Sequence, residues 1–237
     1  MKHLRGGGDD VELDDAAAHH VRNVLRLTVG AEIELFDDAG AVARGRISST
    51  EPAVVARIED ISAPGEDHLK ITIAAAVPKG ERADWMVEKL SELGCERFIP
   101  LRAARSVVLP EGKNKRQRWE RIAIESAKQS RRSGVLRIEE LTDLSDAVGQ
   151  AGAGAFFLST DTSATPAVSA LDPSADRLTL FIGPEGGWSD EELALFAQHE
   201  VRGLKLTDTI LRVETAAVAA MAVLACAQAA SNRKSQI

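Results

Sequence analysis

The chain has 237 residues, of which 44% are hydrophobic and 27% are charged. These values are typical of globular proteins, so they exclude a wholly disordered or fibrous chain, and the length allows one large domain or two unequal ones. The formal net charge of −7 argues against a uniformly basic nucleic-acid-binding protein, because Lys and Arg supply most of the non-specific affinity for phosphates.

The N-terminus and the apolar segments predict a cytoplasmic protein without a membrane anchor. Met1 to Arg5 is followed by glycines and aspartates, not by the apolar segment of a secretory signal. The longest apolar stretch, 216–227, is shorter than the roughly 20 residues that span a bilayer. Cys95 and Cys226 lie far apart and outside any Cys/His cluster, so we expect neither a disulfide nor a metal site.

Short β-type segments that alternate apolar and polar residues dominate the first part of the chain. They cover residues 32–36, 41–47 and 54–58, and the Asp- and Gly-containing segment 37–40 fits a hairpin turn between the first two. A helix is expected over 14–27, where apolar residues recur at helical spacing. These elements predict a small β-barrel-like domain.

A polar segment containing Pro64 and Gly65 marks the expected boundary between a domain of residues 1–66 and a domain of residues 67–237. Beyond it, strand and helix signals alternate, which is typical of an α/β fold with a parallel sheet. The expected strands are 69–77, 98–101, 155–158, 178–182 and 204–206, and the expected helices are 81–93, 115–130, 190–199 and 215–229.

The most specific local motif is a glycine-rich segment, 182–192, between an expected buried strand and an expected helix. Ser189 and Glu192 have the spacing of a capping box at the start of that helix. Glycines let the backbone approach a ligand closely, although a tight turn from strand to helix also explains them. The segment lacks the features of a Walker A loop and of a dinucleotide-binding loop.

A second motif, 206–216, again runs from a strand through a loop into an Ala-rich helix. Arg212 and Glu214 are two residues apart in that segment. They fit either a structural ion pair or a charged pair beside a reaction centre.

Basic residues are concentrated in one segment of this acidic chain. Residues 97–137 contain twelve Lys and Arg against three acids, whereas the first seventy residues contain fourteen acids against eight bases. Such an asymmetry indicates a localised nucleic-acid-binding face on an otherwise acidic protein.

These motifs resemble a known family. Segments 183–187 and 210–216 look like the two C-terminal signatures of the RsmE-type 16S ribosomal RNA uridine N3-methyltransferases, which belong to the SPOUT superfamily. Segments 20–26, 79–94 and 126–131 are similar to further parts of that family, in the same order along the chain. The resemblance therefore covers nearly the whole sequence.

The resemblance implies an α/β fold with a C-terminal SPOUT parallel sheet and a deep trefoil knot, preceded by a PUA-like β-barrel that binds RNA. It also implies a homodimer that acts on 16S ribosomal RNA of the small ribosomal subunit, with S-adenosylmethionine as the cofactor held over three loops. The implied cofactor-binding residues are Leu158, Ser159, Ile182, Gly183, Pro184, Glu185, Gly186, Gly187, Leu206, Thr207, Ile210, Leu211 and Arg212. The chain departs from the family at Thr207, where Gly is usual, and we expect that side chain to point outward.

We expect Arg212 and Glu214 to be the catalytic residues of the implied methyl transfer. Arg212 would stabilise the developing uracil oxyanion, and Glu214 would orient that Arg or relay the proton. The target uridine must be unpaired, since its N3 edge is occupied in a duplex. The expected RNA-binding residues are Arg5, Arg22, Arg26, Lys79, Arg82, Arg102, Arg105, Arg118, Gln129, Arg131 and Arg132.

The sequence leaves two alternative functions open. The chain could be a SPOUT methylase of transfer RNA or of a ribose hydroxyl, or a non-catalytic ribosomal-RNA-binding assembly factor. A nucleotide-hydrolysing switch is disfavoured, because no Lys and Ser/Thr of a phosphate-binding loop are present.

Overall fold

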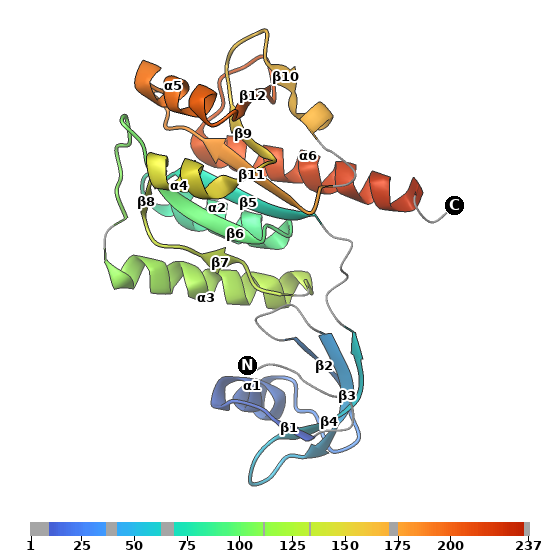
Figure 1. Ribbon diagram of the computed structural model, residues 1–237. Helices are drawn as coiled ribbons and strands as arrows, with labels where there is room; N and C mark the ends of the chain where they lie inside the picture. Colours follow the sequence, from blue (N-terminus) through green and yellow to red (C-terminus); the bar gives the residue numbers. More distant parts are fainter. Residues whose placement is uncertain are drawn as a thin grey trace. The chain divides into compact units, whose positions relative to one another are not determined.

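The computed structural model describes residues 10–36, 42–62, 69–110, 112–132, 134–170 and 175–234. The chain divides into two compact units, Met1–Glu66 with Ser133–Val135, and Asp67–Arg132 with Leu136–Ile237. Figure 1 shows both units in one view. The expected hairpin turn, most of the polar boundary segment, and Arg5 lie outside the described residues.

The first unit contains a four-stranded antiparallel sheet in the order β1-β4-β3-β2. The strands are β1 (Asp10–Glu12), β2 (Glu32–Phe36), β3 (Val42–Ser49) and β4 (Val55–Ser62). Alternate residues face the core, so that Ala43 and Ile47 of β3 are buried with Ala56 and Ile58 of β4. The strands expected in this region are confirmed.

The helix expected over residues 14–27 was predicted too long. The structure has a short α1 (Asp15–His19) that continues as a π-helical turn, η1 (His20–Val24). The backbone of Arg26 then has a φ of 53°, in the left-handed region that ends regular helices. The apolar spacing could not reveal this early end.

The second unit is built on a parallel sheet in the order β10-β12-β9-β11-β5-β6-β7, with β8 paired to β6. Every neighbouring pair in this sheet is parallel. The strands are β5 (Lys70–Ala76), β6 (Arg97–Arg102), β7 (Arg137–Ile138), β8 (Thr142–Asp143), β9 (Ala155–Leu158), β10 (Thr165–Pro166), β11 (Arg177–Ile182) and β12 (Arg202–Lys205).

Helices cover both faces of this sheet (Figure 1). The α-helices are α2 (Glu81–Glu92), α3 (Lys113–Ser130), α4 (Leu144–Ala151), α5 (Asp190–Gln198) and α6 (Val213–Lys234). Apolar residues of α4 and α5 pack with Ala74, Leu101 and Phe181 of the sheet in one cluster. In Figure 1, α4 lies in front of the sheet, and α2 and α6 lie behind it. The α/β class expected from the sequence is confirmed, and α4 is an element that the sequence analysis missed.

No helix in the described parts of the chain combines the length and the apolar character needed to cross a bilayer. The long α6 instead packs against α2 and β5.

Arg132 closes the C-terminal end of α2, although the sequence suggested that it binds RNA. Its Nη1 donates hydrogen bonds to the carbonyl oxygens of Ser91 and Cys95, both at 2.9 Å. Desolvation lowers the pKa of this partly buried guanidinium. The carbonyl groups at a helix end lack intrahelical partners, so a cation there satisfies them.

The neighbouring thiol of Cys95 is fully buried, and this burial raises its pKa to about 12. Because the thiolate is the reactive form, we expect Cys95 to be inert towards a disulfide reagent in the native state at pH 8. A Cys226→Ser variant isolates this thiol. Ellman titration of the variant should detect no thiol before denaturation and one after it. Rapid reaction of the native variant would contradict the buried position.

Candidate functional site

Three loops emerge from the carboxyl ends of three adjacent parallel strands. Strand β9 lies between β12 and β11, with Leu158 opposite Leu204 and Phe157 opposite Phe181. Carboxyl ends of parallel strands meet at one edge of a sheet, where ligands commonly bind in α/β folds. The structure therefore brings together the loops that follow Leu158, Ile182 and Lys205.

Hydrogen bonds tie these loops to one another. The Ser159 amide donates to the Leu204 carbonyl oxygen at 2.8 Å, which joins the first loop to β12. Trp188 at the end of the glycine-rich loop donates from Nε1 to the Leu158 carbonyl oxygen at 3.1 Å. Within the third loop, the exposed hydroxyl of Thr207 accepts a hydrogen bond from the Thr209 amide at 3.3 Å.

The glycines of the second loop have reasons that lie within the fold. A Cβ on Gly183 would lie 2.9 Å from the ring of Trp188, and a Cβ on Gly186 would lie 3.2 Å from the side chain of Arg105. Gly187 has a φ of 73°, which favours glycine. The tight-turn explanation therefore accounts for these residues without a ligand, and their presence alone does not identify a binding loop.

Two side chains from other segments hold this glycine-rich loop in place. Arg105, in the loop after β6, donates from Nη1 to the carbonyl oxygens of Gly186 at 2.6 Å and Trp188 at 3.3 Å. The capping box expected at Ser189 and Glu192 is confirmed. Glu192 is buried and also accepts a hydrogen bond from the Ala104 amide at 2.8 Å. Sequence reasoning placed Arg105 among the RNA-binding residues and did not detect this bracing role.

The second and third loops meet in a cavity of about 410 Å³. This volume falls within the range of about 300–1,000 Å³ that is usual for small-molecule sites. The lining residues come from the start of α2, from the glycine-rich loop and from the third loop, and they are Arg82, Glu185, Ile210, Leu211 and Arg212. The two segments that carry Pro184 and Leu211 thus converge, as the sequence interpretation required.

A buried carboxylate lies beside this cavity. Glu214 is only 6% exposed, and its Oε1 lies 3.3 Å from Nη1 of Arg82. Its Oε2 is buried and has no hydrogen-bond partner among the described residues. The sequence suggested either an ion pair between Arg212 and Glu214 or a charged pair beside a reaction centre. In the structure Glu214 pairs with Arg82, and Arg212 is exposed and lines the cavity.

The other residues expected to bind RNA fall into two groups. Arg22 donates to the carbonyl oxygens of Thr50 and Pro52 within the first unit, and Arg118 and Arg102 pair with Asp84 and Asp143 at 2.8 and 3.5 Å in the second. Arg26 in the first unit and Lys79, Gln129 and Arg131 in the second are exposed, and Arg102 and Arg118 are exposed as well as paired. An exposed side chain can contact a phosphate. Arg102 and Arg118 would then share their charge between the phosphate and a carboxylate, and Arg22 would share its donors with two carbonyl oxygens.

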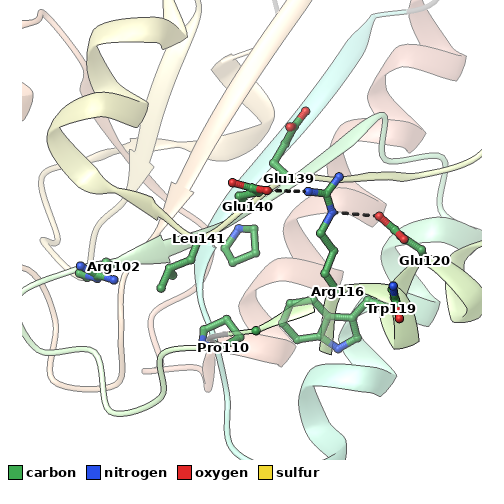
Figure 2. Close-up of a pocket in the computed structure, with 11 residues that line it drawn as sticks. Arg102, Pro110, Arg116, Trp119, Glu120, Glu139, Glu140 and Leu141 are labelled. Carbon is green, nitrogen blue, oxygen red and sulfur yellow. Dashed lines mark hydrogen bonds and ion pairs between the residues drawn. The ribbon is translucent and has the colours of Figure 1, made fainter. Parts of the chain in front are cut away.

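A second cavity, of about 530 Å³, lies beside α3 and is shown in Figure 2. Arg116 crosses it and pairs with Glu120 at 2.9 Å and Glu140 at 3.1 Å. Glu139 and Arg102 complete its charged lining, so that carboxylates outnumber guanidinium groups. This balance disfavours a phosphate ligand, and we assign the cavity no part in the site formed by the three loops.

The described residues contain no group of three or more His, Cys, Asp or Glu side chains arranged to hold a metal ion.

Replacing Glu192 by Ala removes an acceptor for two backbone amides, those of Ser189 and Ala104. Because the carboxylate is buried, we expect the free energy of unfolding to fall by about 1–3 kcal/mol. Glu191→Ala is the matched control, since Glu191 is the adjacent exposed acid. Urea denaturation measures both variants. Equal losses would show that Glu192 contributes only its charge near the helix N-terminus.

Both parts of the chain are similar to known RNA methyltransferases. Residues 65–225 match the model of an RNA methyltransferase domain, and residues 13–59 match an RNA methyltransferase PUA domain. Ribosomal RNA small subunit methyltransferase E of Bacillus subtilis (strain 168) is 32% identical over 219 residues, which cover 87% of this chain and 86% of that protein.

Solved structures show the same similarity. Ribosomal RNA small subunit methyltransferase E from Neisseria gonorrhoeae, bound to S-adenosyl methionine, is 27% identical, with a TM-score of 0.80 over 94% of each chain. Lpg2936 of Legionella pneumophila, in complex with the cofactor SAM, is 31% identical, with a TM-score of 0.77 over 95% of each chain. This chain therefore belongs to the RNA methyltransferase family that includes ribosomal RNA small subunit methyltransferase E.

Proposed function

We propose that this chain is an enzyme that transfers a methyl group from S-adenosylmethionine to N3 of a uridine in 16S ribosomal RNA of the small ribosomal subunit. The observation that carries the proposal is the cavity between the second and third loops, together with the free buried oxygen of Glu214 beside it. The names of the relatives and the cofactor bound in two similar structures support it.

The residues at the three loops fit the methyl donor. The cavity has the volume of a small-molecule site, and Ile210 and Leu211 give it apolar surface next to the charged side chains of Arg82 and Glu185. We propose that the thirteen residues named in the sequence analysis, from Leu158 to Arg212, hold the donor. When bound, the donor supplies an electrophilic methyl group on a positively charged sulfur.

Two charged side chains have different roles at the uracil. The reaction forms a bond from N3 to the methyl carbon, breaks the bond from that carbon to sulfur, and releases the N3 proton. Glu214 would accept that proton through Oε2, which has no hydrogen-bond partner among the described residues and must turn towards the cavity to reach N3. Arg212, exposed at the cavity, would donate to a uracil oxygen as negative charge develops there. Holding the reactants in line supplies much of the remaining acceleration.

The free oxygen of Glu214 also bears on the non-catalytic alternative. A buried carboxylate oxygen without a partner costs stability, which a purely RNA-binding protein has no reason to retain. This observation favours an enzyme over an assembly factor that has lost catalysis.

The proposed RNA substrate needs contacts beyond the reacting base. We propose that the PUA unit and the exposed residues Lys79, Gln129 and Arg131 of the second unit bind phosphates around an unpaired uridine. We propose that the domains are residues 1–66 and 67–237, as expected from the sequence. We also propose that the protein has a trefoil knot, forms a homodimer and is cytoplasmic, as the resemblance implies. Gel filtration with light scattering tests the homodimer.

Glu214→Gln should lower kcat for methyl transfer on the order of 100-fold, the usual lower range for loss of a general base. The variant keeps the shape of the side chain, so binding of S-adenosylmethionine measured by calorimetry should remain. Glu200→Gln changes an exposed acid and is the control. A Glu214→Gln enzyme with wild-type kcat would remove Glu214 from the mechanism.

Arg212→Ala should lower kcat by about 100-fold to 1,000-fold, the effect of losing one oxyanion-stabilising donor. Methylation of small-subunit RNA measures this loss.

A separate measurement identifies the product, by mass spectrometry of nucleosides from small-subunit RNA treated with the wild-type enzyme. We expect N3-methyluridine. A ribose-methylated nucleoside would replace the proposal with the alternative of a ribose methylase.

A further inference from the structure

Arg82 connects three segments of the proposed catalytic site. It is the second residue of α2, and its Nη1 lies 3.3 Å from Oε1 of Glu214 and 3.6 Å from Oε1 of Glu185. Glu214 is the second residue of α6, and Glu185 belongs to the glycine-rich loop. A single guanidinium group therefore joins the starts of two helices and one of the three loops.

The backbone before α2 fixes where this guanidinium lies. Gly80, which precedes the first helical residue, has a φ of 65° and provides no side-chain cap. Lys79 and Gly80 are exposed, whereas Ala83 is buried one residue after Arg82. The turn thus places Arg82 at the border of the core, half-exposed and next to the buried carboxylate.

The two carboxylates in contact with Arg82 have different surroundings. The side chain of Glu185 is 57% exposed, so its contact with Arg82 contributes little, as is usual for surface ion pairs. The side chain of Glu214 is 7% exposed, and Arg82 is its one charged partner among the described residues. Removing the cation from a buried pair leaves an uncompensated charge, which is strongly unfavourable. The contact that matters is the one with Glu214.

We propose that Arg82 is a positioning residue for Glu214, and that it does not serve as a phosphate contact. Arg82 holds Oε1, which leaves Oε2 available to accept a proton. This inference rests on the proposed function and assigns to Arg82 a different role from the RNA binding expected from the sequence. Glu185, on the exposed side, limits access of a phosphate to the same guanidinium.

The test compares Arg82→Gln and Arg82→Lys with Glu214→Gln and with the double variant Arg82→Gln/Glu214→Gln. Methylation of small-subunit ribosomal RNA is measured at varied RNA concentration. We expect Arg82→Gln to lower kcat on the order of 100-fold, as for a misplaced catalytic group, with KM for RNA unchanged. Arg82→Lys should recover part of the loss, because it keeps the charge without the planar guanidinium.

The double variant separates positioning from independent roles. If Arg82 acts through Glu214, the double variant should be no slower than Glu214→Gln alone. Multiplication of the two single losses would overturn the inference. A raised KM for RNA with unchanged kcat in Arg82→Gln would also overturn it, because that result identifies a phosphate contact.

Two controls keep the outcomes distinct. Arg177→Gln changes an exposed arginine at the opposite end of β11 and should leave methylation unchanged, and thermal unfolding verifies that each variant is folded. Inactive wild-type enzyme would defeat the proposed function itself. Active wild-type enzyme with an equally active Arg82→Gln variant would defeat only the inference about Arg82.

Discussion

The parallel alignment of β12, β9 and β11 is the constraint on which the rest of the site depends. Because all three strands run in one direction, the loops that leave them must emerge at the same edge. Phe157 of β9, the middle strand, stacks on Phe196 of α5 with ring centroids 4.5 Å apart, which packs this helix against the sheet. The cavity between the loops is therefore a product of strand order, and side chains only determine what it can bind.

Two arginines bind backbone carbonyl oxygens at opposite ends of the sheet, Arg105 after the end of β6 and Arg132 before its start. Arg105 holds two carbonyl oxygens of the glycine-rich loop, and Arg132 holds two at the end of α2. Each supplies backbone carbonyl oxygens with a charged donor. Fewer basic residues of segment 97–137 are therefore available to bind phosphates than their number suggests, because Arg105 and Arg132 bind backbone carbonyl oxygens.

Much of the fold was readable from local patterns. The continuous apolar runs of β5 and β11 predicted buried parallel strands, and the spacing of Ser189 and Glu192 predicted a helix start. The sequence predicted a candidate site at the loops that follow β9, β11 and β12. The contacts of Arg82 and Arg105 could not be predicted, because their partners lie 132 and 81 residues away and only the folded chain brings them together. Strands of two residues, such as β10, carry too few residues for a pattern.

The contact between Gly183 and Trp188 has a consequence for how this turn can vary. The indole ring occupies the space that any side chain at position 183 would need, and it packs edge-on against Phe196 at 4.9 Å. A larger residue at position 183 is tolerated only if the indole is replaced by something smaller, and a smaller residue at position 188 leaves a void that costs stability. The two positions can therefore change only as a pair, which makes the shape of this turn harder to alter by single substitutions than its exposed position suggests.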